Sequence, residues 1–224
     1  MNRQSRSAGC GSLAPARKVP RGGVRRRELA AVAERAFLEG GFAATTMQAI
    51  AERAGASKET FYRHFANKER LFAEIVRARS ARILGPDRDA PTGAPAIVLA
   101  ELGERALETL FDRESVALFR VVVAEAPRSP ELGAIFYDQG PGRVLRQLAR
   151  YLRWADATAL LRCDEPDKAA ELLLGAMLGP FHLRRVTAPD AAPPDAPARR
   201  AHVGAAIAMF LARYGPPGSG PAGA

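Results

Sequence analysis

Six side chains able to bind nucleic acid lie within seven consecutive residues, in the stretch KETFYRH at positions 58–64. They comprise two cations, a carboxylate, a hydroxyl, a phenol and an imidazole. In protein–DNA complexes such groups bind phosphate oxygens, and several of them also reach base edges in the major groove. The stretch is therefore expected to contact DNA, the alternative being the solvated face of a small helical cluster. The six residues are Lys58, Glu59, Thr60, Tyr62, Arg63 and His64.

Two short helices joined by a tight turn are expected to position these side chains. Thr45 and Gln48 fit a capping box, in which each side chain satisfies a backbone N–H of the other residue. Apolar residues then follow at positions i, i+3 and i+4, which form one face of a helix. Gly55 can adopt the positive φ that ends such a helix. The pattern thus predicts a first short helix that ends at Ala54 and Gly55.

The second helix is expected over roughly Lys58–His64. It follows Ser57, a residue type that caps helix N-termini well. Phe61 and Phe65 are four residues apart and are expected to be buried, which turns the polar side chains outward. At about two turns the helix would be marginal alone, so its stability must come from its neighbours.

Two longer helices are expected on either side of this pair. The first covers residues 25–39 and is stopped by Gly40-Gly41, after which Phe42 fills the small core. The other is capped by Asn67 and extends to Leu84. A helix, a tight turn and a second helix together are typical of proteins that lay one helix in the major groove.

The string TTMQAIAERAGASKETFYRHFANKERLF, residues 45–72, resembles the DNA-binding domain of the TetR family of bacterial transcription regulators. The resemblance extends over about a quarter of the chain, from Arg25 to Phe72, in spacing and identity. The residues that match the family pattern are Ile50, Ala51, Ala54, Gly55, Ser57, Thr60, Tyr62, His64, Phe65, Lys68, Glu69, Leu71 and Phe72.

This resemblance implies a transcription regulator, expected to be a ligand-responsive repressor that binds a palindromic double-stranded DNA operator as a homodimer. The second helix would enter the major groove, with groove contacts from Lys58, Glu59, Thr60 and Arg63. Helix N-termini at Thr45 and Asn67 would offer backbone N–H groups to phosphates. Family positions that meet phosphates correspond to Thr46, Tyr62, His64 and Lys68. The full predicted DNA-binding set is Thr45, Thr46, Ser57, Lys58, Glu59, Thr60, Tyr62, Arg63, His64 and Lys68.

Positive charge is concentrated in the same part of the chain. Residues 1–72 hold 14 Lys and Arg against 6 Asp and Glu, whereas residues 73–224 hold 19 against 18. This is the electrostatic footprint of a DNA-binding unit, and it also fits a non-specific nucleoid-associated protein, which remains the alternative. Residues 1–23 are expected to be disordered when free. They are either a solvated tail, or the product of a start codon assigned too far upstream, or an arm that binds DNA. Such an arm would use Arg17, Lys18, Arg21 and Arg25–Arg27.

Other function classes find little support. No nucleophile elbow, phosphate-binding loop or zinc signature is present, so we expect no catalytic residue, no cofactor and no metal. A third hypothesis is an enzyme or small-molecule carrier that retains a vestigial DNA-binding head. Cys10 and Cys163 lie far apart, which suits the reducing cytoplasm, and no apolar run approaches the roughly 18 residues of a membrane span.

The rest of the chain is also expected to be helical, which makes the fold all-α. Proline-rich stretches at 85–95 and 188–198 predict loops. Helices are expected at about 95–111, 115–126, 130–138, 142–161, 166–186 and 195–213. The predicted organisation is a basic tail (1–23), a helix-turn-helix domain (24–72), a helical ligand-binding and dimerisation domain (73–214) and a second tail (215–224). Residues 119–152 resemble the C-terminal domain of a TetR subgroup that is often called AefR-like.

In the TetR family this second domain pairs two subunits and often encloses a ligand cavity. A cavity would need apolar walls with a few polar groups. The predicted ligand-binding residues are Phe111, Phe119, Phe136, Tyr137, Tyr151, Trp154, Phe181 and His182, and each could equally be ordinary core. The residues predicted to form the dimer interface could also be ordinary internal core. They are Leu172, Ala176, Gly179, Val203, Ile207 and Phe210.

Overall fold

The computed structural model of the chain describes residues 21–85, 92–188 and 190–216. Within these residues it contains ten α-helices and no strand, which confirms the all-α prediction. The helices are α1 (Arg21–Gly40), α2 (Met47–Arg53), α3 (Lys58–His64), α4 (Lys68–Leu84), α5 (Pro95–Leu110), α6 (Arg113–Glu125), α7 (Pro130–Gln139), α8 (Pro141–Ala157), α9 (Pro166–Thr187) and α10 (Ala196–Tyr214).

Helix ends follow local chemistry. Four of the bundle helices, α5, α7, α8 and α9, carry proline at the first helical position, where its missing N–H costs nothing. Helix α8 stops at Ala157, four residues before the predicted end, and Ala159 adopts a φ of 58°. Residues 1–20, which include Arg17 and Lys18 of the predicted arm, and residues 217–224 lie outside the described part of the chain.

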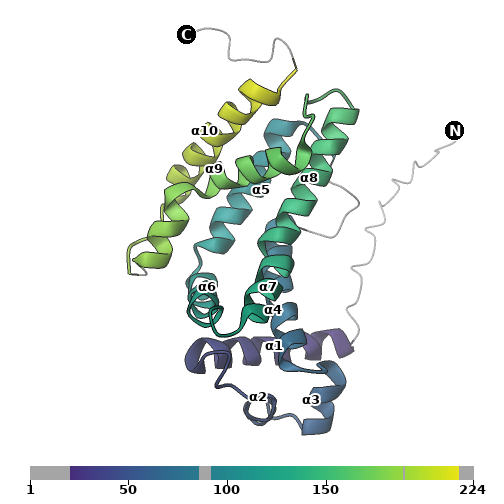
Figure 1. Ribbon diagram of the computed structural model, residues 1–224, viewed down its shortest axis with the longest axis vertical. Coiled ribbons are helices and arrows are strands. Elements are labelled where there is room, and N and C mark those ends of the chain that lie inside the picture. The colour runs from purple at the N-terminus through teal and green to yellow at the C-terminus, as the bar shows by residue number, and fades with distance from the viewer. Residues whose placement is uncertain (1–20, 86–91, 189, 217–224) are drawn as a thin grey trace, which may run out of the picture.

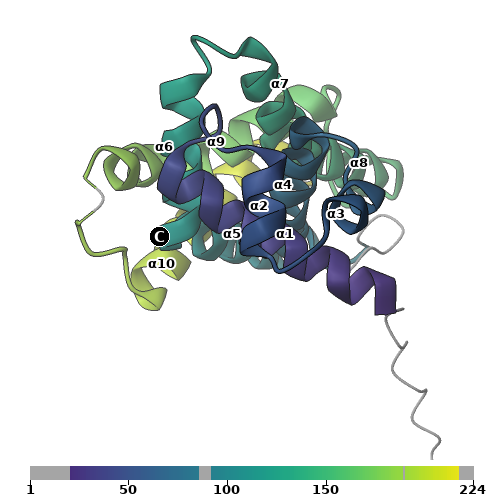
Figure 2. The same cartoon turned by 90° about the horizontal axis from the view of Figure 1, so that it is seen from below.

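The helices form two groups (Figure 1). Helices α1, α2 and α3 lie at one end of the molecule, and α5 to α10 form a bundle at the other. Helix α4 joins the groups, since it packs on α1 and also on α5, α7 and α8. Seen from below, α1, α2 and α3 lie in front of the bundle (Figure 2). The predicted boundary at residue 72 therefore falls inside one continuous helix.

Two main apolar cores correspond to these groups. The first is rich in aromatic rings: Phe37, Phe42 and Phe72 have centroids 5.1 to 6.2 Å apart, and Phe61 and Phe65 pack beside them. This core also takes in buried residues of the bundle helices, namely Leu118, Val122 and Leu132. The second core fills the space between α5, α8, α9 and α10. The aromatic core thus fixes the three N-terminal helices to the bundle as well as to one another.

Candidate DNA interface and ligand cavity

Helix α2 begins one residue later than the capping-box prediction. Thr46, not Thr45, is the N-cap, and its hydroxyl accepts from the backbone N–H of Ala49 at 3.1 Å. Thr45 is buried, and its hydroxyl donates to the carbonyl of Gly41 at 2.6 Å to close the loop after α1. The Gln48 amide donates to Glu52 and does not complete a box. The predicted N-cap at Thr45 is therefore corrected to Thr46, which lies at the surface, while the Thr45 side chain is turned inward.

Helix α3 has the predicted bounds and cap. The Ser57 hydroxyl accepts from the backbone N–H of Thr60 at 3.2 Å and donates to the Thr60 hydroxyl at 2.9 Å. Phe61 and Phe65 are buried beneath the helix, with ring centroids 5.7 Å apart. Arg26 of α1 lies 4.7 Å over the Phe65 ring. These contacts anchor one face of α3 and leave the opposite face open.

The open face carries Lys58, Glu59, Tyr62 and Arg63, which are all exposed. Lys58 lies 6.0 Å from the Tyr62 ring, and within the described chain neither Lys58 nor Arg63 forms an ion pair. Arg53 of α2 differs, because its guanidinium pairs with Glu39 of α1. The cations of α3 are therefore not engaged by carboxylates of the described part of the protein. Thr60 and His64 lie at the edge of this face and are half-buried.

Lys68 makes contacts within the chain that the family pattern did not predict. Its ammonium donates to the backbone carbonyls of Phe42 at 2.7 Å, Thr45 at 3.1 Å and Ala43 at 3.3 Å. It also lies 4.4 Å from the centroid of the Phe42 ring. Because these three carbonyls use the ammonium's three donors, Lys68 fastens the loop between α1 and α2, and the predicted phosphate contact would compete with these hydrogen bonds.

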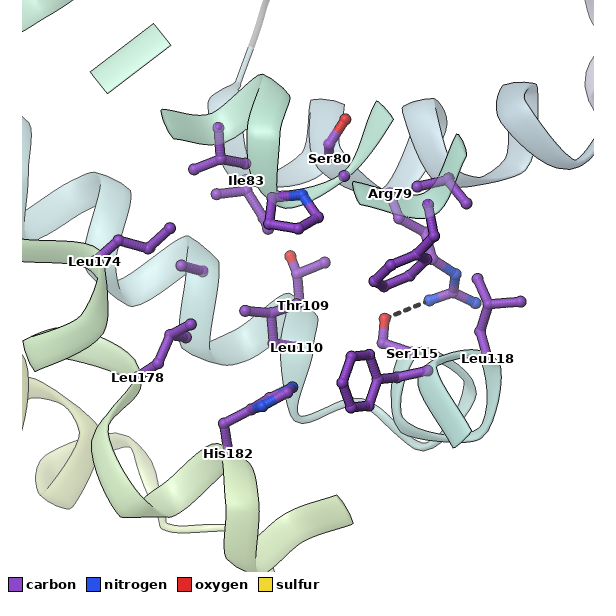
Figure 3. A pocket seen from close by; sticks show the side chains of 17 residues that line it. Arg79, Ser80, Ile83, Thr109, Leu110, Ser115, Leu118, Leu174, Leu178 and His182 are labelled. Atoms are coloured by element: carbon purple, nitrogen blue, oxygen red, sulfur yellow. Dashed lines mark hydrogen bonds between the residues drawn. The ribbon is translucent and has the colours of Figure 1, made fainter. Parts of the chain in front are cut away.

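A cavity of about 120 Å³ lies in the bundle between α4, α5, α6, α8 and α9 (Figure 3). Its walls are mostly apolar, and polar side chains enter at a few points. The polar lining residues are Arg79, Ser80, Thr109, Ser115 and His182. The apolar lining includes Val76, Ile83, Leu110, Leu118, Phe119, Phe136, Val144, Leu174 and Leu178.

Three of the eight predicted ligand residues line this cavity: Phe119, Phe136 and His182. Phe119 packs against both, at 5.6 Å from Phe136 and 5.0 Å from the His182 ring, centroid to centroid. The structure does not bring the other five into the cavity. Phe111, Tyr151, Trp154 and Phe181 pack in or against the second core, and Tyr137 is exposed.

A kink in α9 accounts for the position of His182. Gly179 has φ 45° and ψ −151°, a conformation that residues with a Cβ seldom adopt. Pro180 follows it, lacks an N–H and disfavours helical geometry in the residue before it. The segment after this break carries His182 to the cavity. Burial lowers the pKa of His182 from its ordinary value of 6.5, so the imidazole is neutral at neutral pH.

The sequence pattern missed Arg79, Thr109 and Ser115. Thr109 could have been found from the sequence, because it continues the apolar face of α5 formed by Leu99, Leu102 and Ala106. A single hydroxyl on a buried apolar face needs a hydrogen-bond partner, which marks the position as a candidate ligand contact. Arg79 of α4 and Ser115 of α6 are 36 residues apart in the chain, and their 2.6 Å contact exists only in the folded protein (Figure 3).

Arg79 stands between the cavity and the N-terminal helices. It pairs with Glu34 of α1 at 2.5 Å, with Asp112 at 3.2 Å and with Glu114 of α6 at 3.0 Å. Burial alone would lower the pKa of Arg79, but attraction to Glu34 and Asp112 outweighs it and raises the pKa. Burial would likewise raise the pKa of Asp112, and hydrogen bonds from Ser115 with attraction to Arg79 lower it. The cluster joins α1, α4 and α6.

A second contact joins the other end of α6 to the loop before α2. The two carboxylate oxygens of Glu125 accept from the backbone N–H groups of Phe42 and Ala43, each at 2.7 Å. Helix α6 therefore lines the cavity near its first turns and holds the loop of the N-terminal helices at its last residue.

The predicted dimer residues fall into two sets. Val203, Ile207 and Phe210 are 1 to 6% exposed in the single chain, because α10 packs them against α5 and α9. Their assignment to a dimer interface is therefore corrected to the intramolecular core. Leu172 of α9 is 55% exposed, whereas Ala176 and Gly179 are half-buried.

No helix within the described residues is long and apolar enough to cross a membrane. Among those residues, no group of three or more His, Cys, Asp or Glu side chains is placed to hold a metal ion.

Two family models match the chain. Residues 97–216 match the AefR-like transcriptional repressor C-terminal domain, and residues 29–75 match the bacterial regulatory proteins of the tetR family. The first match alone covers more than half of the 224 residues.

Similar proteins agree with these models. The flavonoid-responsive regulator FrrA is 32% identical, with a TM-score of 0.70 over 87% of this chain and 99% of that one. A TetR-family transcriptional regulator from Mesorhizobium loti is 29% identical, with a TM-score of 0.69 over 88% and 100%. The repressor AcnR of Corynebacterium diphtheriae is 35% identical over 60 residues, which are 27% of this chain. That match spans only 32% of AcnR, about a third of its length.

Proposed function

Because the chain belongs to the TetR family of bacterial transcription regulators, which are not enzymes, we propose that it is a ligand-responsive repressor that binds a palindromic operator as a homodimer. The observation that carries the proposal is the open face of α3. Lys58 and Arg63 project from a helix whose other face is anchored on Phe61, and no carboxylate of the described chain neutralises them. Its place of action would be the bacterial cytoplasm, where the chromosome lies.

In this proposal α3 enters the major groove. Arg63 can donate two hydrogen bonds to a guanine edge, and Glu59 can accept from a cytosine. Tyr62 and Thr46 would contact phosphates, and we assign Lys58 to a phosphate as well, in place of the groove contact expected from the family pattern. The N-terminus of α2 adds backbone N–H groups at the same surface. Ser57, Thr60 and His64 support this face from its edge, whereas Lys68 acts through the loop that it fastens.

Homodimerisation is proposed to use the outward faces of α9 and α10. Leu172 and Met209 are 55% and 63% exposed on these helices. Gly175 and Gly204 have no heavy atom within 4 Å of the position a Cβ would take, so another backbone could approach closely there. A symmetric pair built on these faces would carry two α3 helices and read two half-sites about one DNA turn apart.

The ligand response is proposed to arise in the cavity, since two of its walls also hold the N-terminal helices. Helix α4 enters both cores, and α6 reaches the loop before α2 through Glu125. A molecule that binds better when α4 and α6 are further apart would favour a conformer in which the two α3 helices no longer fit the operator. The flavonoid response in the name of FrrA supports a small organic effector for this chain.

Selection of bound duplexes from a random DNA library, near physiological salt, tests the proposal. Enrichment of one palindrome, bound by a particle of twice the 24.0 kDa chain mass, is expected. The Arg63→Ala variant should alter the enriched sequence, and Arg150→Ala, which removes an exposed arginine from α8, should not. Binding without enrichment that falls steeply with salt would instead identify a non-specific nucleoid-associated protein.

A further inference from the structure

Two polar side chains of the cavity have no hydrogen-bond partner within the described chain. One is Thr109 of α5, which is 3% exposed, and the other is His182 of α9. In Figure 3 His182 reaches from α9 into the cavity and Thr109 enters it from α5. The remaining polar lining groups are occupied, since Ser80 donates to the Arg77 carbonyl and Ser115 accepts from Arg79. Both groups face the open space of the cavity and are not sealed within packed protein, so a bound molecule can supply the hydrogen-bond partner that the described chain does not.

The rest of the cavity favours a flat, unsaturated molecule. Phe119, Phe136 and His182 bring three rings to one side of it, with Phe119 at the centre. Rings that meet edge to face gain stability beyond the area they bury. A bound aromatic ring would extend this arrangement, whereas a saturated ring of the same size would offer only apolar area.

Charge in the cavity disfavours an anion. The Arg79 guanidinium already donates to Glu34, Asp112, Glu114 and the Ser115 hydroxyl. Arg82 also pairs with Asp112, so the cluster has two arginines against three carboxylates, and the positive charge of Arg79 is more than balanced. Neutral His182 supplies no positive charge either. A carboxylate ligand would be buried without a counter-charge, which is strongly unfavourable.

The volume of the cavity limits the size of the molecule that it can hold. The cavity volume of about 120 Å³ is close to that of an engineered apolar cavity, roughly 150 Å³, that accommodates benzene. It falls short of the roughly 300 Å³ or more of a cavity for drug-sized molecules. We propose that the effector site takes a neutral, single-ring aromatic molecule with a hydroxyl group, a simple phenol, which hydrogen-bonds to Thr109 and His182. This inference rests on the proposed effector role of the cavity but concerns ligand chemistry alone.

Direct binding to the DNA-free protein, measured by isothermal titration calorimetry at pH 7, tests this assignment. The reference probe is phenol. Relative to phenol, toluene lacks the hydroxyl, cyclohexanol lacks the aromatic ring, and benzoate carries a negative charge. Phenol is expected to bind more tightly than toluene by roughly two- to tenfold per hydrogen bond gained. Cyclohexanol should bind more weakly than phenol, and benzoate should show no binding at the same concentrations.

Variants locate the site. Thr109→Val is nearly isosteric and should weaken phenol binding roughly two- to tenfold while leaving toluene unchanged. Thr187→Val, at the exposed end of α9, is the matched control. Ala106→Phe should fill the cavity and abolish binding of every probe, and a far-UV circular dichroism melt verifies that each variant folds. Benzoate binding as tight as phenol, equal affinities for phenol and cyclohexanol, or no response to Thr109→Val would overturn the assignment. Failure to bind any probe would also overturn it, yet would leave the operator selection intact as a separate test of the proposed function.

Discussion

The contact between Lys68 and the loop before α2 gives a prediction that separates a structural lysine from a DNA-binding one. Replacing Lys68 with methionine keeps an unbranched apolar side chain close to the length of the lysine stem but removes the ammonium. Three carbonyls then lose their donor, at original distances of 2.7, 3.1 and 3.3 Å. The contact with the Phe42 ring at 4.4 Å is lost as well.

The magnitude follows from the partial exposure of these groups. A hydrogen bond to a charged group contributes roughly 1.5–3 kcal/mol, but water can replace the donor at the exposed Ala43 carbonyl. The part-buried carbonyls of Phe42 and Thr45 recover less. Lys68→Met is therefore expected to lower the free energy of unfolding by about 2–3 kcal/mol.

Lys58→Met is the matched control, since it removes the same charge from the same unit. Lys58 is exposed and, within the described residues, has no hydrogen bond or ion pair and lies 6.0 Å from the Tyr62 ring, so its loss should change the free energy of unfolding by less than about 0.5 kcal/mol. Urea unfolding, followed by far-UV circular dichroism at one protein concentration, measures both effects. On operator DNA, Lys58→Met should reduce the slope of log affinity against log salt by about one, whereas folded Lys68→Met should keep that slope.

The reverse pattern would refute this reasoning. If Lys68→Met unfolds at the same urea concentration as the parent and lowers the salt slope as Lys58→Met does, the ammonium leaves the carbonyls for a phosphate. The assignment drawn from the family pattern would then be right and the one drawn from the geometry wrong.

Four further predictions follow from single contacts. Arg63→Ala should relax preference at one base pair of the operator, by about 1–3 kcal/mol, as read from competition between duplexes that differ at each position. Glu125→Gln replaces one of two acceptor oxygens for backbone N–H groups with an amide donor, so it should destabilise the protein by about 1–2 kcal/mol and speed hydrogen exchange at Ala43; unchanged exchange would argue against the contact. Gly103→Ala would place a Cβ 2.7 Å from Val203, so α5 and α10 must separate, at a cost of about 1–3 kcal/mol seen as a lower melting temperature. The pKa of His182 is lowered from 6.5 on folding, so the unfolded chain binds its proton more readily; stability should be complete above about pH 7 and fall as the pH drops below 6.5, and His182→Phe should flatten that fall in urea midpoints.

Local signals determined the helices and the recognition surface. Ser57 and Asn67 accept from the third residue of the helices that they cap, as their residue types predict. Phe61 and Phe65 are buried, because a spacing of four residues puts both on one face of a helix. Such features depend on neighbours within a few positions, which the amino-acid sequence contains in full.

Two features could not be predicted from neighbouring residues: which threonine caps α2, and what the Lys68 ammonium contacts. Thr45 and Thr46 are chemically alike, and only the position of Gly41 across the loop decides which hydroxyl turns inward. Lys68 meets carbonyls 23 to 26 residues earlier in the chain, a distance that no local pattern reports.

The amino-acid sequence by itself determined an all-α chain in which α3 exposes a basic, polar face, since periodicity, caps and charge are properties of short segments. Only the tertiary structure decided which apolar faces meet. It turned Val203, Ile207 and Phe210 inward and left five of eight candidate residues outside the cavity. It also brought Arg79 to Ser115 across 36 positions. Apolar helix faces are interchangeable in sequence, and burial is assigned only when the helices pack.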